Sequence, residues 1–409
     1  MAVVRPFSAL RPPAGRAAQV AAVPYDVVNT EEARALVSGN PWSFLHVSRP
    51  EIDLPPDTNI YDDEVYSKAQ SNFEQLTKEC PLVMEEMPSL YLYRLIMGDH
   101  EQIGVVACCS VDDYDENIIR KHERTRRDKE DDRTRHMLAL HAQTGPVFLT
   151  YRAQANIDAM IAEALAHNPP LYDFVASDDI RHTIWRVPTY DDLVEAFRDV
   201  PYLYIADGHH RAASASRARA ALKEQGFAFS GSEEYNFFLC VIFPDNQLQI
   251  LPYNRIVRDL KGLSKEDFLI RVRESFTVME DAGATPPDRA HWNMFLDGRW
   301  YGLTLPPRTS IPEGAVAWLD VSILQEHLLA PILGIKDVRT DKRIDFVGGI
   351  RGPQELEKLV NDGKAVVAFS LCPTTVDDLL RVSDAGEIMP PKSTWFEPKL
   401  RDGLLIHRI

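Results

Sequence analysis

Residues Tyr204–Arg211, with the sequence Tyr-Ile-Ala-Asp-Gly-His-His-Arg, place a carboxylate, two imidazoles and a guanidinium around one glycine. The apolar run at 202–206 predicts a strand, and the alanine-rich segment 211–222 predicts a helix. The first backbone N–H groups of a helix and its dipole favour an anion. A plain strand-to-helix turn needs Asp207 as a cap and Gly208 for an unusual backbone angle, but it needs no histidines or arginine. The stretch therefore predicts a phosphate-binding loop.

A second candidate is the charged run Arg120–Arg133, which contains His122 and Glu123. A mixed charge run is usually the solvated surface of a helix. His122 and Glu123, however, precede the helix predicted at 128–141, and loops carry many functional groups. A carboxylate beside a histidine can act as a general base, and arginines such as Arg133 can bind phosphate oxygens through two hydrogen bonds. The sequence leaves both interpretations open.

Two further segments carry weaker signals. Asp26 lies in the run Pro-Tyr-Asp-Val-Val at 24–28, where a turn aspartate is the common interpretation. The segment 389–399, Met-Pro-Pro-Lys-Ser-Thr-Trp-Phe-Glu-Pro-Lys, resembles a proline-stiffened stretch held by its aromatic side chains. Three polar residues of this segment are also candidates for binding an anion or a substrate: Lys392, Ser393 and Thr394.

The composition limits the classes of function. The chain has 409 residues, of which 45% are hydrophobic and 26% charged, as in soluble globular proteins, and this length predicts two or three domains. Its formal net charge of -16 argues against sequence-independent binding of DNA or RNA, which needs a basic surface. The N-terminus lacks the pattern of a signal peptide, and no apolar run reaches membrane-spanning length. We therefore expect a cytoplasmic protein with no membrane partner.

The cysteines and the paired histidines do not predict a zinc site. The five cysteines are odd in number and show no CxxC pair, so neither a disulfide framework nor a structural zinc site is expected. Cys108 and Cys109 lie in an apolar run, where we expect buried packing residues. Neighbouring side chains diverge at a helix start, so His209 and His210 are not expected to share a zinc ion.

Predicted strands and helices alternate along the whole chain without repeats or low-complexity tracts, which is typical of α/β or mixed α+β proteins. A compact run of alternating strands and helices extends from 183 to 243 and contains the loop. Breaks in the pattern near Pro169 and Gly262 divide the chain into three parts. These parts are 1–170, 171–260 and 261–409.

Four ordered motifs resemble a large bacterial family whose members carry a domain of unknown function and are often labelled ParB-like or free-serine kinase. The motifs are Val-Pro-Tyr-Asp at 23–26, Lys-His-Glu-Arg-Thr at 121–125, Ala-Asp-Gly-His-His-Arg at 206–211 and Pro-Pro-Lys-Ser-Thr-Trp-Phe-Glu-Pro-Lys at 390–399. The resemblance spans nearly the full length of the chain. It implies a ParB/sulfiredoxin-like core at 171–260 around the loop, with extra α/β segments before and after it.

The loop itself separates the activities of this superfamily. Sulfiredoxin-like enzymes carry Gly-Cys-His-Arg, whereas this chain has His209 at the cysteine position, so their thiol chemistry is not expected. ParB proteins carry a Gly-Glu-Arg-Arg type of loop followed by a DNA-reading helix-turn-helix, and here His209 and His210 replace the Glu-Arg pair. The small serine kinases carry Asp-Gly-His-His-Arg, which matches Asp207–Arg211 letter for letter.

The resemblance implies a nucleotide-dependent kinase that phosphorylates free L-serine or a similar small hydroxy metabolite, with Mg²⁺ and ATP or ADP as cofactors. Arg211 and the amides after Gly208 would hold the donor phosphates, and Asp207 would position Mg²⁺ or a water molecule near the phosphates. A carboxylate would accept the proton of the serine hydroxyl, with Glu123 as the first candidate and Asp26 as the second. A phosphate-ester hydrolase and a nucleotide-binding ParB-like regulator are the alternatives.

The predicted site residues fall into four groups. The catalytic groups are Glu123, Asp207, His210 and Asp26, and the metal ligand is Asp207. The phosphate- or nucleotide-binding residues are Gly208, His209, His210, Arg211, His122 and Arg133. The substrate-binding residues are Lys392, Ser393 and Thr394. The partners expected are therefore a nucleotide and a small-molecule substrate, and not a nucleic acid.

Overall fold

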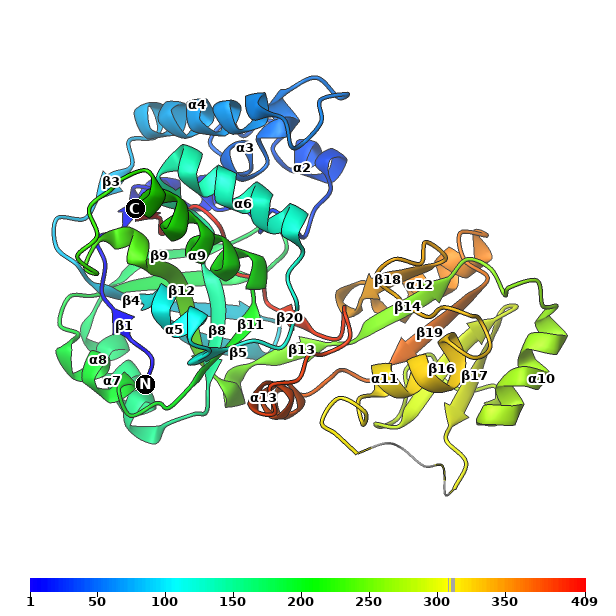
Figure 1. Ribbon diagram of the computed structural model, residues 1–409. Coiled ribbons are helices and arrows are strands. Elements are labelled where there is room, and N and C mark those ends of the chain that lie inside the picture. The colour runs from blue at the N-terminus through cyan, green and yellow to red at the C-terminus, as the bar shows by residue number, and fades with distance from the viewer. Residues whose placement is uncertain (308, 310–312) are drawn as a thin grey trace. The chain divides into compact units, whose positions relative to one another are not determined.

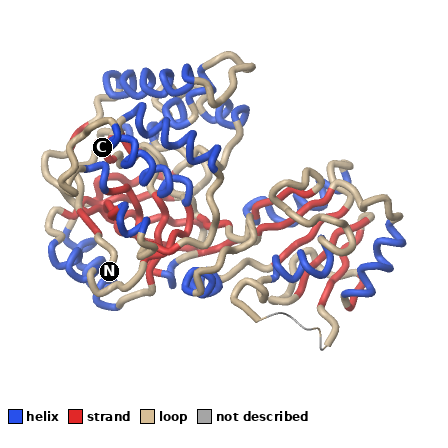
Figure 2. Tube along the Cα trace, viewed as in Figure 1, coloured by secondary structure: helices blue, strands red, loops and turns tan. Residues whose placement is uncertain are grey.

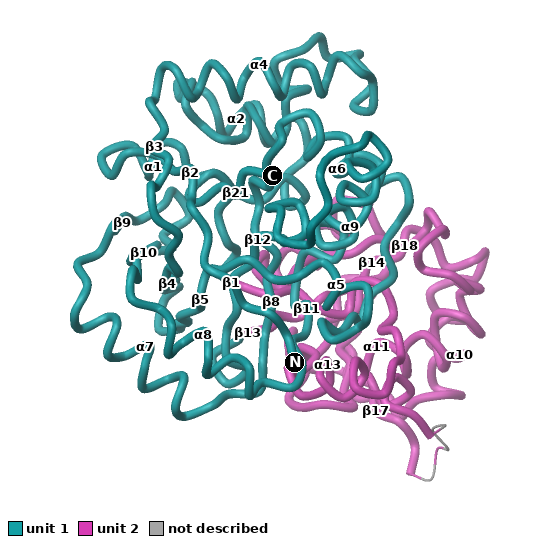
Figure 3. Tube along the Cα trace, turned by 60° about the vertical axis from the view of Figure 1, so that its left-hand side comes forward, with its two compact units in different colours: residues 1–248, 398–409 teal, residues 249–397 magenta. Residues whose placement is uncertain are grey.

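The computed structural model describes residues 1–307, 309 and 313–409 (Figure 1). Helices and strands alternate along the chain (Figure 2), which confirms the mixed α/β class predicted from the sequence. The chain forms two compact units (Figure 3): residues 1–248 with 398–409, and residues 249–397. These bounds differ from those of the three parts expected, because strands from both sides of residue 170 join one sheet.

The first unit is built on a large mixed sheet. Its strands follow the order β6-β11-β8-β12-β5-β4-β10-β9, with β1 added beside β5. The pairs β6–β11 and β8–β12 are parallel, and the other pairs are antiparallel. The strands are β1 (Val4–Arg5), β4 (Leu90–Met97), β5 (His100–Ser110), β6 (Ile119–Arg120), β8 (Val147–Tyr151), β9 (Pro170–Val175), β10 (Arg181–Val187), β11 (Leu203–Asp207) and β12 (Phe237–Pro244).

Helices and two short ladders complete the first unit. The α-helices are α1 (Ala17–Val20), α2 (Thr30–Leu36), α3 (Leu45–Ser48), α4 (Asp63–Glu79), α5 (Val111–Asp115), α6 (Arg127–Leu140), α7 (Ala155–His167), α8 (Asp191–Phe197) and α9 (His209–Glu224). Short 3-10 turns lie at Ala14–Arg16, Pro50–Asp53, Glu234–Asn236 and Asp245–Gln247. The ladders pair β2 (Leu10–Arg11) with β3 (Val83–Met84), and β7 (Ala142–Gln143) with β21 (His407–Arg408).

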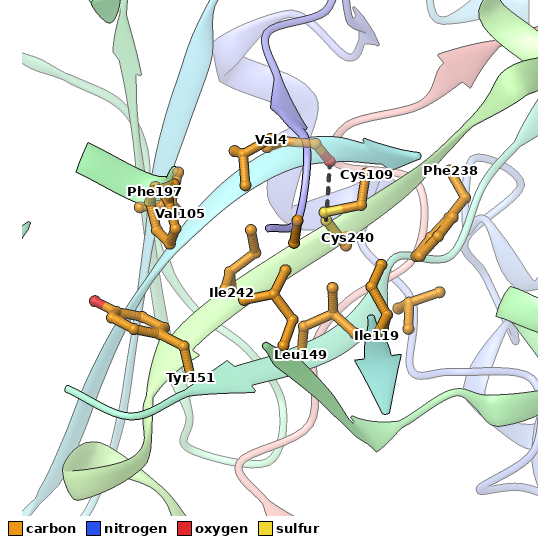
Figure 4. Packing of buried hydrophobic residues seen from close by; sticks show 14 of the residues in the cluster. Val4, Val105, Cys109, Ile119, Leu149, Tyr151, Phe197, Phe238, Cys240 and Ile242 are labelled. Atoms are coloured by element: carbon orange, nitrogen blue, oxygen red, sulfur yellow. Dashed lines mark hydrogen bonds between the residues drawn. The ribbon is translucent and has the colours of Figure 1, made fainter. Parts of the chain in front are cut away.

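Alternate residues of the central strands form the core of the first unit. Because side chains alternate across a strand, Leu149 and Tyr151 of β8 share one face of the sheet with Cys240 and Ile242 of β12. Figure 4 shows these side chains packed together with Val105 of β5. The short side chains of three alanines in α9 also belong to this cluster: Ala212, Ala215 and Ala218. This packing fixes the axis of α9, and with it the place where the helix begins.

Three cysteines lie in the core of the first unit: Cys108, Cys109 and Cys240. Cys108 and Cys109 are fully buried, as predicted, and the Sγ of Cys240 lies 3.3 Å from the Sγ of Cys109 (Figure 4). Burial raises the pKa of both the Cys108 and Cys109 thiols. A thiol kept protonated in this way is a poor nucleophile, so these residues serve packing.

The second unit has its own antiparallel sheet with the strand order β15-β17-β16-β19-β14-β18. Its strands are β14 (Tyr253–Val257), β15 (Thr277–Glu280), β16 (His291–Leu296), β17 (Arg299–Thr304), β18 (Ile344–Gly348) and β19 (Val367–Leu371), with a separate ladder of β13 (Gln249–Leu251) and β20 (Trp395–Glu397). Its helices are α10 (Lys265–Ser275), α11 (Asp320–Leu324), which runs on into a π-helical turn at Gln325–Leu329, α12 (Gly352–Asn361) and α13 (Val376–Asp384), with a 3-10 turn at Gly349–Arg351. Among the described helices, none is long and apolar enough to cross a bilayer.

Gly403 tests the packing of the C-terminal segment, defined as residues 398–409. A β-carbon at Gly403 would lie 2.5 Å from the buried ring of Phe44, and the backbone has φ +82°. Gly226 has a nearly identical φ of +83°, but a β-carbon there would meet open space. We expect Gly403→Ala to lower the free energy of unfolding by about 1–3 kcal/mol more than Gly226→Ala, because only the former overpacks the core. Denaturant titration of both variants measures this difference, and equal midpoints would contradict it.

Candidate functional site

The phosphate-binding loop predicted at Asp207–Arg211 follows the end of β11. Strand β6 runs parallel to β11, with Ile119 opposite Leu203, so both strands end at the same edge of the sheet. The segment 121–126 leaves β6 there and leads into α6, while Gly208 leads from β11 into α9. Carboxyl ends of neighbouring parallel strands, followed by helix starts, form a common place for ligand binding. The His-Glu-Arg-Thr motif and the loop are therefore brought together by this strand pairing.

Gly208 makes the turn between strand and helix. It is the residue before the first turn of α9 and has φ 92° and ψ 28°, in the left-handed region that favours glycine. A β-carbon here would lie 3.4 Å from the Val147 Cα and 3.3 Å from the Arg211 guanidinium. The amide of Gly208 donates to the Oδ1 atom of Asp207 at 2.8 Å. Glycine therefore lets the backbone turn sharply while Asp207 and Arg211 stay close to it.

The side chains of the loop point to two different groups of partners. The ring of His209 packs edge-to-face on His122, with centroids 4.5 Å apart. Ligand atoms of His122, Glu123 and His209 all lie within 4.8 Å of one another. In contrast, the Nη2 atom of Arg211 lies 3.8 Å from the Oδ2 atom of Asp26. Successive residues of a helix are rotated by about 100°. The loop therefore has an imidazole side and a guanidinium side.

Asp207 is held as a carboxylate by cations. Its Oδ2 atom accepts a hydrogen bond from the Nζ atom of Lys399 at 3.0 Å. Burial opposes the charge of Asp207, but Lys399 and Arg211 outweigh this effect and hold the pKa of the carboxyl well below its usual range. Lys399 is the last residue of the motif at 390–399, and the sequence predicted no role for it. Its position beside the loop depends on the return of the C-terminal segment to the first unit, which no local pattern reveals.

Arg211 is buried and has donors that the protein does not use. It is 8% exposed, and its Nη1 atom donates to the carbonyl oxygen of Pro146. Among the described residues, the Nε and Nη2 atoms have no hydrogen-bond partner. Buried donors are nearly always paired, and a guanidinium matches the geometry of phosphate oxygens. Arg211 thus has unused donors of the geometry that an anion requires.

Burial keeps the histidines of the site neutral. It lowers the pKa of His122 to about 4, and it lowers the pKa of His209 well below the usual range. It also lowers the pKa of His210, whose Nε2 atom accepts a hydrogen bond from the Arg126 amide at 3.1 Å. A neutral imidazole that accepts at Nε2 carries its proton on Nδ1. At neutral pH, His210 can therefore donate one hydrogen bond to an anion.

The Pro-Tyr-Asp motif is fixed beside the loop. Arg49 donates from Nη1 to the carbonyl oxygens of Tyr25 at 3.0 Å and Val28 at 3.1 Å. The guanidinium of Arg133 lies over the Tyr25 ring, 4.1 Å from its centroid, and Arg133 also pairs with Asp132 at 2.9 Å. Arg133 is thus held by protein contacts behind the loop, and its predicted role in phosphate binding stays a prediction.

A small cavity with both polar and apolar walls lies beside Arg211. Its volume is about 40 Å³, and Tyr25, Arg133, Arg211 and Asp402 are among its lining residues. The Oδ1 atom of Asp402 has no hydrogen-bond partner among the described residues. A cavity with this volume has room for water, and the polar groups among its lining residues could bind it. Burial raises the pKa of Asp402 to about 7, although Arg211 acts in the opposite direction.

Lys392, Ser393 and Thr394 belong to the second unit. The Ser393 hydroxyl donates to the Pro390 carbonyl oxygen at 2.6 Å, and the Ser393 carbonyl accepts from the Thr374 hydroxyl at 2.9 Å. The Lys392 ammonium lies over the ring of Tyr253, 5.5 Å from its centroid. These contacts order the segment within its own unit, and its predicted role in substrate binding stays a prediction.

The raised pKa of Asp402 makes stability depend on pH. The folded chain keeps a proton at Asp402 up to about pH 7, whereas an unfolded chain loses it near pH 3.9. Between these values the folded state binds more protons, so this group makes stability fall as pH rises. Asparagine mimics the neutral carboxyl, so we expect Asp402→Asn to become progressively more stable than the wild type between pH 5 and pH 8, by up to about 1.4 kcal/mol per pH unit.

Denaturant titration at several pH values measures this difference. The exposed Asp99→Asn variant controls for the loss of one carboxyl group. A difference between Asp402→Asn and the wild type that stays constant with pH would show that Asp402 is ionised throughout.

Comparisons with known proteins show which sequences and structures the chain is similar to. No curated protein matches it. Among solved structures, a free serine kinase in complex with AMP is 13% identical, with a TM-score of 0.34 over 72% of this chain and 86% of that chain. A conserved hypothetical protein from Pyrococcus furiosus is 14% identical, with a TM-score of 0.33 over 73% of this chain and 94% of that chain. SbnI with C-terminal truncation from Staphylococcus aureus is 13% identical, with a TM-score of 0.37 over 71% of this chain and 82% of that chain.

These TM-scores are too low to establish a common fold, and the family comparison is the firmer finding. Residues 4–322 match the model of the family described as "Protein of unknown function (DUF1015)". The matched range contains the Pro-Tyr-Asp motif, the His-Glu-Arg-Thr motif and the phosphate-binding loop. The chain belongs to this family.

Proposed function

We propose that the first unit is a nucleotide-dependent phosphotransferase, a kinase that phosphorylates free L-serine or a similar small hydroxy metabolite. The observation that carries this proposal is the buried guanidinium of Arg211, which has unused donors beside a helix start. Three motifs of the bacterial family also meet at this place, although they are far apart in the sequence, and one of them, Asp207–Arg211, matches the loop of the small serine kinases. Phosphoryl transfer depends mainly on positioning and on neutralising charge, and these are what the site supplies.

The donor phosphates would bind at the start of α9. The first amides of a helix have no partner within the helix, and the helix dipole favours an anion there. Arg211 would add two donors, His210 would add one donor from Nδ1, and Lys399 would add a second positive charge.

Asp207 is the candidate ligand for Mg²⁺. It is ionised, as a Mg²⁺ ligand must be, and its oxygens keep lone pairs beside the hydrogen bonds that they accept from Gly208 and Lys399. Asp207 thus fits the role of holding Mg²⁺, which would neutralise charge on the phosphates.

Asp26 would accept the proton of the attacking hydroxyl. Its carboxylate lies on the guanidinium side of the loop, 3.8 Å from Arg211, and 39% of its side chain is exposed. A small substrate could therefore approach it from solvent. Glu123, the first candidate from sequence, lies on the imidazole side with His122 and His209. The position of the phosphate-binding donors favours Asp26 over Glu123 for this step.

The activity test supplies L-serine with ATP, ADP or pyrophosphate in the presence of Mg²⁺, and it measures phosphoserine. We expect product with one of these donors, and a loss of about 10²-fold in rate for Arg211→Lys, because lysine cannot reproduce the two-donor geometry. Arg219→Lys is the matched control: Arg219 is an equally buried arginine of α9 that pairs with Asp112 and Asp115. Absence of phosphoserine with every donor would contradict the proposal, and phosphate release without serine would indicate the hydrolase alternative.

Asp26→Asn tests the assignment of the proton acceptor. We expect kcat to fall by about 10²-fold or more, because asparagine cannot take the proton, while the Kd for the nucleotide changes little. Single-turnover kinetics and calorimetry of nucleotide binding measure the two quantities separately. Wild-type turnover in Asp26→Asn, with loss of turnover in Glu123→Gln, would transfer the role to Glu123.

A further inference from the structure

Two histidines and a glutamate gather on the imidazole side of the loop. His122 and Glu123 follow β6, and His209 begins α9. One ligand atom from each of these residues lies within 4.8 Å of the other two. Two loops from neighbouring parallel strands therefore present three metal-binding side chains to one point.

The imidazoles of this cluster are buried with few hydrogen-bond partners. His122 is 2% exposed and His209 is 5% exposed. Among the described residues, no hydrogen bond of good geometry reaches the ring nitrogens of His122, although the backbone of Ile205 is close enough to act as a weak partner. The Nε2 atom of His209 has no partner among them. Leaving a buried polar group unpaired costs about 1–3 kcal/mol. A neutral imidazole has one nitrogen with a lone pair, so one nitrogen of each ring, together with the Glu123 carboxylate, can bind a ligand that accepts electron pairs.

We propose that His122, Glu123 and His209 bind a divalent transition-metal ion of the Zn²⁺ class. Neutral imidazole and carboxylate are ligands of Zn²⁺, and two histidines with one glutamate leave a fourth position open for water or substrate. Mg²⁺ prefers oxygen ligands, so the ion expected at this cluster differs in kind from the one proposed at Asp207. In a tetrahedral site with Zn–N distances of about 2.0–2.1 Å, the ligand atoms lie about 3.4 Å from one another. Here they lie within 4.8 Å of one another, so each ligand atom would have to move by about 1 Å to bind one ion. Glu123 has a further interaction within the protein, as ligating carboxylates commonly do.

Metal binding is measured on the full chain, without a histidine tag and after treatment with a chelator. We expect one equivalent of Co²⁺ to give the visible absorption of a low-coordinate site, and Zn²⁺ but not Mg²⁺ to displace it. His122→Ala, His209→Ala and Glu123→Gln should each weaken binding by more than about 10²-fold, the upper range for losing only an outer partner of a ligand. His210→Ala is the matched control, because this neighbouring histidine lies on the guanidinium side, and it should keep one equivalent.

Two further readouts keep the proposal testable when a variant does not fold. Circular dichroism identifies such variants, and anomalous diffraction from wild-type crystals soaked in Zn²⁺ locates the ion directly. The absence of saturable binding, an ion elsewhere, or retention of binding in both His122→Ala and His209→Ala would overturn the proposal. The measurements contain no nucleotide or serine, so their outcome is independent of the phosphotransfer assay.

Discussion

The buried charge of Arg211 is the constraint around which the first unit is organised. Three acidic side chains act on this guanidinium: the carboxylates of Asp26 and Asp207, and Asp402, which burial keeps protonated below about pH 7. They belong to the Pro-Tyr-Asp motif, to the end of β11 and to the C-terminal segment, which are far apart in the sequence. A buried cation without nearby countercharges is strongly destabilising. The three segments must therefore come together for the unit to be stable, and the site is assembled by the same requirement.

The turn of the helix after Gly208 divides this site into two environments. On one side, Arg211 and His210 lie near Asp26 and offer donors to an anion. On the other side, His209 packs against His122, and buried neutral nitrogens offer electron pairs. Consecutive residues of one short motif thus serve opposite chemical needs. A plain phosphate-binding turn needs no histidines, and these two environments give each histidine of the motif a separate role.

Local patterns predicted much of the fold. The sequence predicted a helix at 128–141, observed as Arg127–Leu140, and a helix at 211–222, observed as His209–Glu224. Such patterns depend on neighbours in the sequence. Strand β6 has two residues, and it pairs with a strand more than eighty residues away, so no periodicity could reveal it. The same pairing brings Glu123 to the loop, which is why sequence could name this residue but not its surroundings.

The role of Lys399 follows from how the C-terminal segment is anchored. Asp402 exchanges two backbone hydrogen bonds with Ala22, at 2.8 and 3.2 Å, and β21 pairs with β7. Several such bonds, each contributing about 0.5–1.5 kcal/mol, and the pair of Arg401 with Asp178 hold the segment in place without depending on the Lys399–Asp207 pair. The Lys399 ammonium is therefore a countercharge more than an anchor. On the proposed function, the Lys399 ammonium would add positive charge near a phosphate bound beside Arg211, which gives a physical reason for a lysine at this position.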